Sequence, residues 1–160
     1  MALCGDTVEI AKKWDKPIRL LFLDADHSYK AVELDFNAWG KYLAPEGIVA
    51  IHDSLCWLGV YKFTLKLIVS GNFKNFKTLT ANSMGLTYAF KKARGEEISK
   101  FERVKSLLSF VFLSLPKLPV LVRVYFSQRE ETDFWYQFFD WLAKFYRKLK
   151  RMVRGWLWRK

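Results

Sequence analysis

The chain has 160 residues, of which 51% are hydrophobic and 27% charged. This composition excludes a disordered or collagen-like chain and suits one globular domain with a substantial core. The 27 Lys and Arg outnumber the 16 Asp and Glu, and residues 96–160 hold 14 of the basic and 7 of the acidic side chains. A basic end of this kind favours an anionic partner, such as phospholipid, nucleic acid or an acidic protein.

The cysteines and the N-terminus point to the cytoplasm. Cys4 and Cys56 show no metal-ligand spacing, so we expect buried thiols in a reducing compartment. Residues 1–16 lack the basic start and apolar core of a signal peptide. The most apolar segment, residues 106–126, nearly reaches the length of a spanning helix, but two prolines and two cations interrupt it. We therefore predict that it is interfacial or buried.

The first half of the chain predicts a strand–helix–strand unit. A short amphipathic helix is expected over residues 5–14, and the nearly continuous apolar run at 18–24 is typical of a strand covered on both faces. Apolar residues then recur every three or four positions over 29–43, which predicts a helix. A turn at 44–47 leads into a second apolar strand at 48–51. The two strands should be parallel, with a right-handed crossover.

The second half begins with a helix and a hairpin and ends in helices. Residues 57–70 have a helical pattern, whereas 76–80 and 86–92 are typical of two strands joined by a turn with the sequence NSMG. After the hairpin the alternation stops, and helical pieces broken by two prolines follow. We predict an α/β domain over residues 1–94 and a helical extension over residues 95–160.

Ionisable side chains follow both predicted parallel strands. Asp24 ends the first strand, and His52 and Asp53 end the second. Ligands of parallel α/β sheets bind at the carboxyl ends of the strands, and neighbouring strands lie about 4.8 Å apart. Two carboxylates so close can share a divalent cation, with His52 as a nitrogen ligand. His27 would lie just outside the ion, as a general base for a hydroxyl.

A structural role explains the same residues equally well. Asp24 or Asp26 can cap the following helix, and Ser28 can serve in the same way. His52 can be a hydrogen-bonded histidine beneath a loop. Spacing alone leaves both interpretations open.

Two stretches, LLFLDADHSYKAVELDFNAW and YLAPEGIVAIHDS, resemble the second half of class I S-adenosylmethionine-dependent methyltransferases. The resemblance covers about residues 3–92 and is greatest to the metal-dependent branch that includes macrocin-type sugar O-methyltransferases. It implies part of a Rossmann-like sheet, strands four to seven, that ends in an antiparallel hairpin.

The resemblance also implies roles for the residues at the strand ends. Asp24 matches an aspartate that binds magnesium in the family, and His52 and Asp53 match an acidic pair that binds the same ion. His27 matches the proposed base. Because some relatives carry Glu where this chain has His52, the ion implied is magnesium or another divalent cation.

For S-adenosylmethionine, the resemblance implies contacts to Gly5, Asp6 and Thr7, in a loop that touches the adenine, and to Asp24. The family binds this cofactor mainly through a glycine-rich loop after the first strand. None of the eight glycines here forms that motif. The resemblance is therefore to a half-fold, and we expect an oligomer, a partner or further sequence to supply the other half.

The last segment, residues 132–160, has apolar residues at helical spacing, and eight Lys or Arg with no acid from residue 144 onward. This pattern favours a helix at the surface of an anionic membrane, at its cytoplasmic face. Packing onto the domain or onto a partner is the second interpretation. Nucleic acid is the least favoured, since no recognised binding module is present.

The sequence thus predicts an O-methyltransferase, or its C-terminal part, that acts on the hydroxyl of a small molecule, a sugar or a lipid-linked saccharide. The alternative is a non-catalytic methyltransferase-like scaffold that docks on a membrane or on a partner protein.

Overall fold

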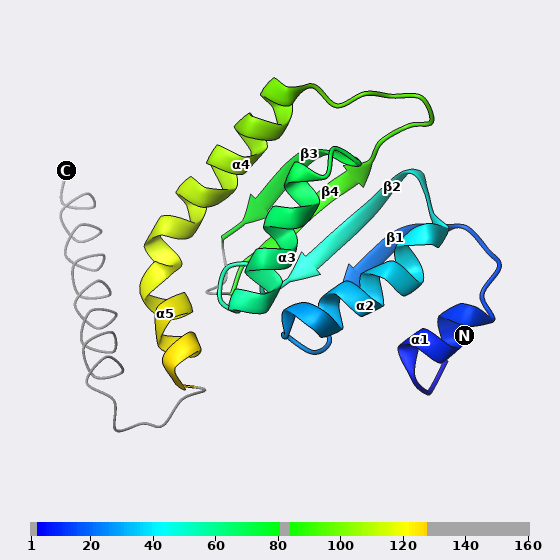
Figure 1. The fold of residues 1–160 in the computed structure, drawn as a ribbon, viewed down its shortest axis with the longest axis horizontal. Coiled ribbons are helices and arrows are strands. Elements are labelled where there is room, and N and C mark those ends of the chain that lie inside the picture. The colour runs from blue at the N-terminus through cyan, green and yellow to red at the C-terminus, as the bar shows by residue number, and fades with distance from the viewer. Residues whose placement is uncertain (1–2, 81–83, 128–160) are drawn as a thin grey trace, which may run out of the picture. The chain divides into compact units, whose positions relative to one another are not determined.

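A computed structural model describes residues 3–80 and 84–127 of the chain. The chain divides into two compact units, Met1–Leu115 and Pro116–Lys160. The first unit contains a four-stranded mixed sheet with the order β1-β2-β4-β3 and has the predicted α/β architecture (Figure 1).

The parallel strand pair at the centre of the prediction is confirmed. Strands β1 (Ile18–Leu23) and β2 (Leu43–His52) are parallel, with Leu23 opposite Ile51. Helix α2 (Tyr29–Trp39) and the short 3-10 helix η1 (Gly40–Tyr42) connect them. Strand β2 begins earlier than predicted because the expected turn is absorbed into it.

The predicted hairpin is also confirmed. After helix α3 (Leu58–Val69), strand β3 (Phe73–Leu79) pairs antiparallel with β4 (Leu86–Lys91), and β4 in turn pairs antiparallel with β2. The last strand therefore lies between β2 and β3, and the parallel pair β1 and β2 ends at one common edge.

The main core lies between the sheet and helices α2 and α3, which cover the same face (Figure 1). Alternate residues of the strands point into it, as period-2 side-chain geometry requires. The buried members include Leu21, Val49, Ile51, Phe63 and Ala89. Phe63 is 2% exposed, so the α3 side of this core excludes water.

The opposite face of the sheet differs from the prediction. Leu20 and Phe22 of β1 are 58% and 50% exposed, although the apolar run predicted a strand covered on both faces. Among the described residues, β1 is also an edge strand. The apolar run of β1 therefore contains more apolar side chains than the described residues bury.

Helix α1 (Thr7–Lys12) lies beside α2. Asp6 caps it, because the Asp6 carboxylate accepts hydrogen bonds from Val8 N and Glu9 N, both at 2.9 Å. The indole of Trp39 donates to Thr7 Oγ1 at 2.7 Å, which ties α1 to the end of α2.

Helix α4 (Lys100–Ser114) belongs to the first compact unit. Its Phe110 packs with Leu55 and Ile68 in a second small core. The unit therefore extends beyond the boundary predicted at residue 94, because α4 packs on α3 and β3. The 3-10 helix η2 (Leu115–Lys117) and helix α5 (Leu118–Ser127) follow.

Within the described part of the chain, the helical stretch Lys100–Val122 is, by length and composition alone, long and apolar enough to cross a membrane. Its most apolar window of 18 residues has a mean hydropathy of 1.5, and 17% of that window is buried. The basic segment 132–160 lies outside the described residues, so its predicted helix and membrane contact remain predictions.

Candidate metal and cofactor site

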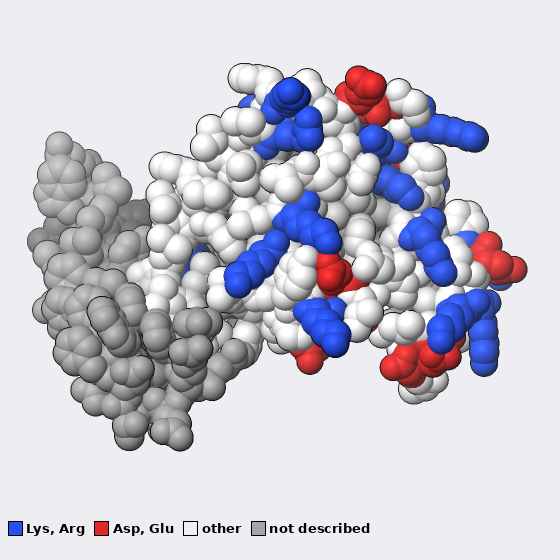
Figure 2. Space-filling model, in the orientation of Figure 1, with Lys and Arg blue, Asp and Glu red and all other residues white. Residues whose placement is uncertain are grey.

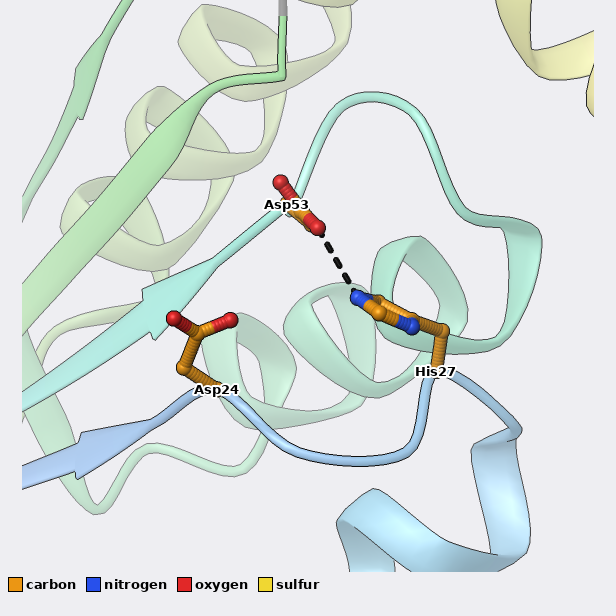
Figure 3. Close-up of side chains that lie close together, drawn as sticks. All are labelled: Asp24, His27 and Asp53. Atoms are coloured by element: carbon orange, nitrogen blue, oxygen red, sulfur yellow. Dashed lines mark hydrogen bonds and ion pairs between the residues drawn. The ribbon is translucent and has the colours of Figure 1, made fainter.

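Two aspartates lie side by side where β1 and β2 end (Figure 3). Asp24 directly follows β1, and Asp53 directly follows β2. Asp53 has a φ of 57°, a left-handed conformation that Asp tolerates better than most residues. It is only 5% exposed, so its carboxylate is one of the few buried charged groups of the domain.

His27 joins this pair from the loop before α2 (Figure 3). Its Nε2 lies 2.8 Å from Asp53 Oδ2, a hydrogen bond in which the imidazole donates if Nε2 carries the proton. The imidazole also stacks on Trp57, with ring centroids 4.5 Å apart. A carboxylate on one nitrogen and an indole on one face fix the ring, and they leave Nδ1 as its other basic atom.

His52 bridges the two aspartates. Its Nδ1 lies 3.1 Å from Asp24 Oδ1 and 3.1 Å from Asp53 Oδ1. The contact to Asp24 has hydrogen-bond geometry, whereas Asp53 Oδ1 is buried without a hydrogen-bond partner among the described residues. A buried carboxylate oxygen without a hydrogen bond is costly, and a cation is one group that would add to the contact with His52 in compensating it.

The donor set fits a divalent ion. One ligand atom each from Asp24, His27 and Asp53 can be chosen so that all three lie within 4.8 Å of one another. A cavity of about 10 Å³ lies beside Asp24, His27 and His52, although Asp53 is not among its lining residues, and it has room for one particle of about the size of water. Two carboxylates suit magnesium or manganese, and the imidazoles shift the preference toward softer ions.

The structure brings the four residues predicted at the strand ends close together. The two carboxylates converge, which the metal hypothesis required. The sequence assigned Asp24, His52 and Asp53 to the metal and His27 to proton transfer, whereas in the structure both imidazoles lie next to the aspartates.

The capping interpretation holds for the neighbours of Asp24. Ser28 is the N-cap of α2, and its Oγ accepts a hydrogen bond from Ala31 N at 3.3 Å. Asp26 accepts one from Ser28 N at 2.6 Å, which lowers the pKa of its carboxyl group. Asp24 is not part of this cap, and its carboxylate instead contacts His52.

Gly59 positions the loop that carries His27, a role that the sequence analysis did not predict. A Cβ at Gly59 would lie 2.3 Å from His27 O and 2.4 Å from Tyr29 N, both backbone atoms. Only glycine therefore allows the first turn of α3 to approach this loop. A glycine near the start of a predicted helix was the only signal available.

Asp35 of α2 lines the same small cavity and was also missed. Burial raises the pKa of its carboxyl group above the ordinary value, and the negative charges of Asp6 and Asp26 add to the shift. Asp35 was hidden within the helical pattern of residues 29–43.

The loop predicted to touch adenine borders a larger pocket. Gly5 and Asp6 line a pocket of about 460 Å³, mostly apolar, together with residues that include Ile10 and Trp14. Thr7 is not among the lining residues and is held instead by the indole of Trp39. Asp6 uses one carboxylate oxygen to cap α1.

Comparison with known families gives a match over one part of the chain. Residues 2–54 match a family described as "Methyltransferase domain". This segment contains Gly5, Asp6 and Thr7 and the whole cluster at the strand ends. It relates the first third of the chain to methyltransferase domains and thereby supports the coarse family resemblance.

Among solved structures, the chain is similar to the MycE methyltransferase from the mycinamycin biosynthetic pathway, solved with Mg, SAH and mycinamycin VI. The two share 17% sequence identity, with a TM-score of 0.42. The match covers 64% of this chain and 34% of MycE. The chain thus spans about a third of the length of that enzyme.

Proposed function

We propose that this chain is part of an S-adenosylmethionine-dependent O-methyltransferase and contains its metal and proton-transfer residues. The observation that carries the proposal is the convergence of Asp24, His27 and Asp53 within 4.8 Å, inside a segment that matches a methyltransferase domain. An acidic pair and a histidine at the ends of two parallel strands are what metal-assisted activation of a hydroxyl requires.

His27 would take the proton of the acceptor hydroxyl. Its Nε2 faces Asp53 Oδ2, so Asp53 holds the ring orientation and stabilises the imidazolium that forms. Nδ1 would then be the accepting atom. Stacking on Trp57 keeps water from one side of the ring and limits its rotation.

Asp24, His52 and Asp53 would hold the divalent ion, and His27 stands close enough to be an alternative ligand. Such an ion lowers the pKa of a bound hydroxyl, and the sulfonium of S-adenosylmethionine supplies an already activated methyl group. The contribution of the chain is orientation, which alone can provide several kcal/mol.

The cofactor would contact Gly5, Asp6, Thr7 and Asp24, with its adenine toward the pocket beside α1. The acceptor is proposed to be a sugar or lipid-linked saccharide hydroxyl, by the resemblance to sugar O-methyltransferases. Segment 132–160 would hold the protein at an anionic membrane on the cytoplasmic side.

The open edge and open face of β1 favour a second candidate, a scaffold that docks on a partner. Leu20 and Phe22 are about half exposed on β1, which is an edge strand of the sheet within the described residues, and a surface of this kind is typical of an interface. The same surface could receive the rest of a methyltransferase sheet, from a partner, an oligomer or further sequence.

Metal binding tests the proposal directly. Titration with Mn²⁺, followed by electron paramagnetic resonance, should show a metal site in the full chain. Asp53→Asn should lower its affinity for Mn²⁺ by about tenfold or more, because losing a direct metal ligand costs at least as much affinity as losing a residue that only hydrogen-bonds to a ligand. Glu97→Gln is the matched control, because Glu97 is an exposed acid outside the cluster. Equal affinity in Asp53→Asn and wild type would remove the metal from the proposal.

Calorimetric titration with S-adenosylmethionine, with and without Mg²⁺, separates the two candidates. Binding would support the enzyme. No heat of binding from a folded chain that holds Mn²⁺ would favour the scaffold. Circular dichroism of each variant verifies that the fold is intact.

A further inference from the structure

Helix α4 carries a continuous apolar stripe on its solvent side. The stripe consists of Phe101, Val104, Leu108 and Phe112 of α4 and continues to Leu115, the first residue of η2, with exposed fractions of 77%, 51%, 63%, 70% and 49%. The spacings of 3, 4, 4 and 3 place them within about 80° of the helix circumference, at about 100° per residue. A contiguous apolar surface of this kind is rare on soluble monomers and marks an interaction site.

The opposite side of α4 is anchored to the domain. Phe110 and Ser114 are 2% and 1% exposed. Tyr61 of α3 packs against the Phe110 ring with centroids 5.0 Å apart, and its hydroxyl lies 3.1 Å from Ser114 Oγ. Lipid cannot surround α4 on all sides while these contacts exist.

Beyond the first turn of α4, the charges beside the stripe are positive. Lys100 and Lys105 are exposed near the start of α4, and residues 103–126 contain no acid. The acid in the first turn, Glu102, accepts a hydrogen bond from Asn75 N at 3.4 Å. Figure 2 shows uncharged surface over the middle of α4 and Lys or Arg side chains near its start.

An apolar groove with two cations lies beside the stripe. It has a volume of about 330 Å³ and is lined by Val69, Lys100, Arg103, Val104 and Leu107. Arg103 Nη1 donates to Val69 O at 3.4 Å, whereas Arg103 Nε is buried without a hydrogen-bond partner among the described residues. Apolar walls next to a guanidinium and an ammonium suit an acyl chain with an anionic headgroup.

We propose that α4 lies along the surface of an anionic bilayer, with its apolar stripe at the boundary of headgroups and acyl chains. Charge complementarity selects this occupant. A second copy of the chain, which carries a net charge of +11, would bring the same cations together. Residues 144–160 of the chain, with eight basic side chains and no acid, would repel them too, whereas the four acids that follow residue 126 all lie within residues 130–140. The inference uses α4 and its groove alone and does not depend on methyl transfer.

Flotation of the full chain with phosphatidylglycerol vesicles tests the inference. The wild-type chain should float with these vesicles and far less with phosphatidylcholine vesicles. The double variant Leu108→Glu/Phe112→Glu should bind at least about tenfold more weakly, because two inserted side chains are lost. The matched control is Leu34→Glu, at a position on α2 that is 50% exposed, and it should bind like wild type.

A polarity-sensitive fluorophore separates α4 from the basic C-terminal segment. Attached at Leu108→Cys in a Cys4→Ser background, it should shift to the blue on vesicles, whereas the same probe at Leu34→Cys should not shift. Wild-type binding by the folded double variant, or no shift at position 108, would overturn the proposal. A dimer of the wild-type chain would also overturn it, if sedimentation shows that the dimer forms without lipid, that it does not bind vesicles, and that the double variant is monomeric.

Discussion

The two faces of the central sheet are built from the same strands and meet different surroundings. On one face, Leu21, Val49 and Ile51 pack beneath α2 and α3 in a core closed to water. On the other, Leu20 and Phe22 of the same β1 are about half exposed. A strand with apolar residues on both sides is typical of a sheet covered twice, so the sequence of β1 suits more cover than the described residues provide.

The catalytic candidates belong to the strand ends and not to either face. Asp24 and Asp53 are held by the pairing of β1 with β2 and by the loops that lead into α2 and α3. The two loops lead into the helices that cover the closed face of the sheet. The site can therefore be rigid even where the opposite face is open.

The largest effect is expected on the closed face. Phe63→Ala removes a side chain that is 2% exposed and contacts Phe36 with ring centroids 5.2 Å apart. We expect a loss of about 3–5 kcal/mol in the free energy of unfolding, from lost transfer energy and the cavity left behind. Urea denaturation measures it, and a loss below about 1 kcal/mol would show that this core is not closed.

A much smaller effect is expected on the open face. Phe22→Ala changes a side chain that is 50% exposed, and the loss should stay below about 1.5 kcal/mol in the isolated chain. The same urea measurement in the presence of a partner that covers β1 should give a larger loss. Equal losses in the free energy of unfolding for Phe22→Ala and Phe63→Ala in the isolated chain would contradict the inference that one face of the sheet is closed and the other open.

The smallest effect concerns pH and Asp35, at the margin of the closed face. Its pKa is raised in the folded state, first by burial and then by Asp6 and Asp26, so the folded chain binds this proton more tightly than the unfolded one. Stability from this group is present below the unfolded pKa and is lost as pH rises through the folded pKa. Asp35→Asn should therefore slightly raise the melting temperature at neutral pH and lose this advantage in acid.

Scanning calorimetry at neutral pH and in acid measures these melting temperatures. The control is a variant of an exposed carboxylate. Glu97→Gln, at an exposed position, should show no such pH dependence. A lower melting temperature for Asp35→Asn at neutral pH would mean that the carboxylate has a favourable partner there.

The sequence predicted the order of the elements of the α/β unit because they follow local rules. Period-2 and 3.6-residue patterns located the parallel pair, its crossover helix and the hairpin, and a strand that ends in an acid located Asp24 and Asp53. What it missed depends on distant contacts. The stack of Trp57 on His27, the approach of Gly59 to the same loop and the position of Asp35 all depend on how the helices dock.

The start of β2 was also misplaced, for a local reason. Residues 44–47 have the composition of a turn, yet β2 runs through them, with Glu46 at a φ of 61°. The irregular pairing between Ile18 and Leu20 accommodates the extra length. A single pattern cannot distinguish a turn from a distorted strand of the same composition.

The register of β1 against β2 decides which side chains meet at the strand ends. Leu23 faces Ile51, so the next residue on each strand, Asp24 and His52, arrives at the same height, and Asp53 follows one step later. A slip of one residue would turn the alternating side chains to the opposite surface. The backbone hydrogen bonds between β1 and β2 therefore determine whether the side chains at the strand ends meet. A substitution within either strand that shifts this register would separate Asp24 from His52 and Asp53 without changing any of these residues.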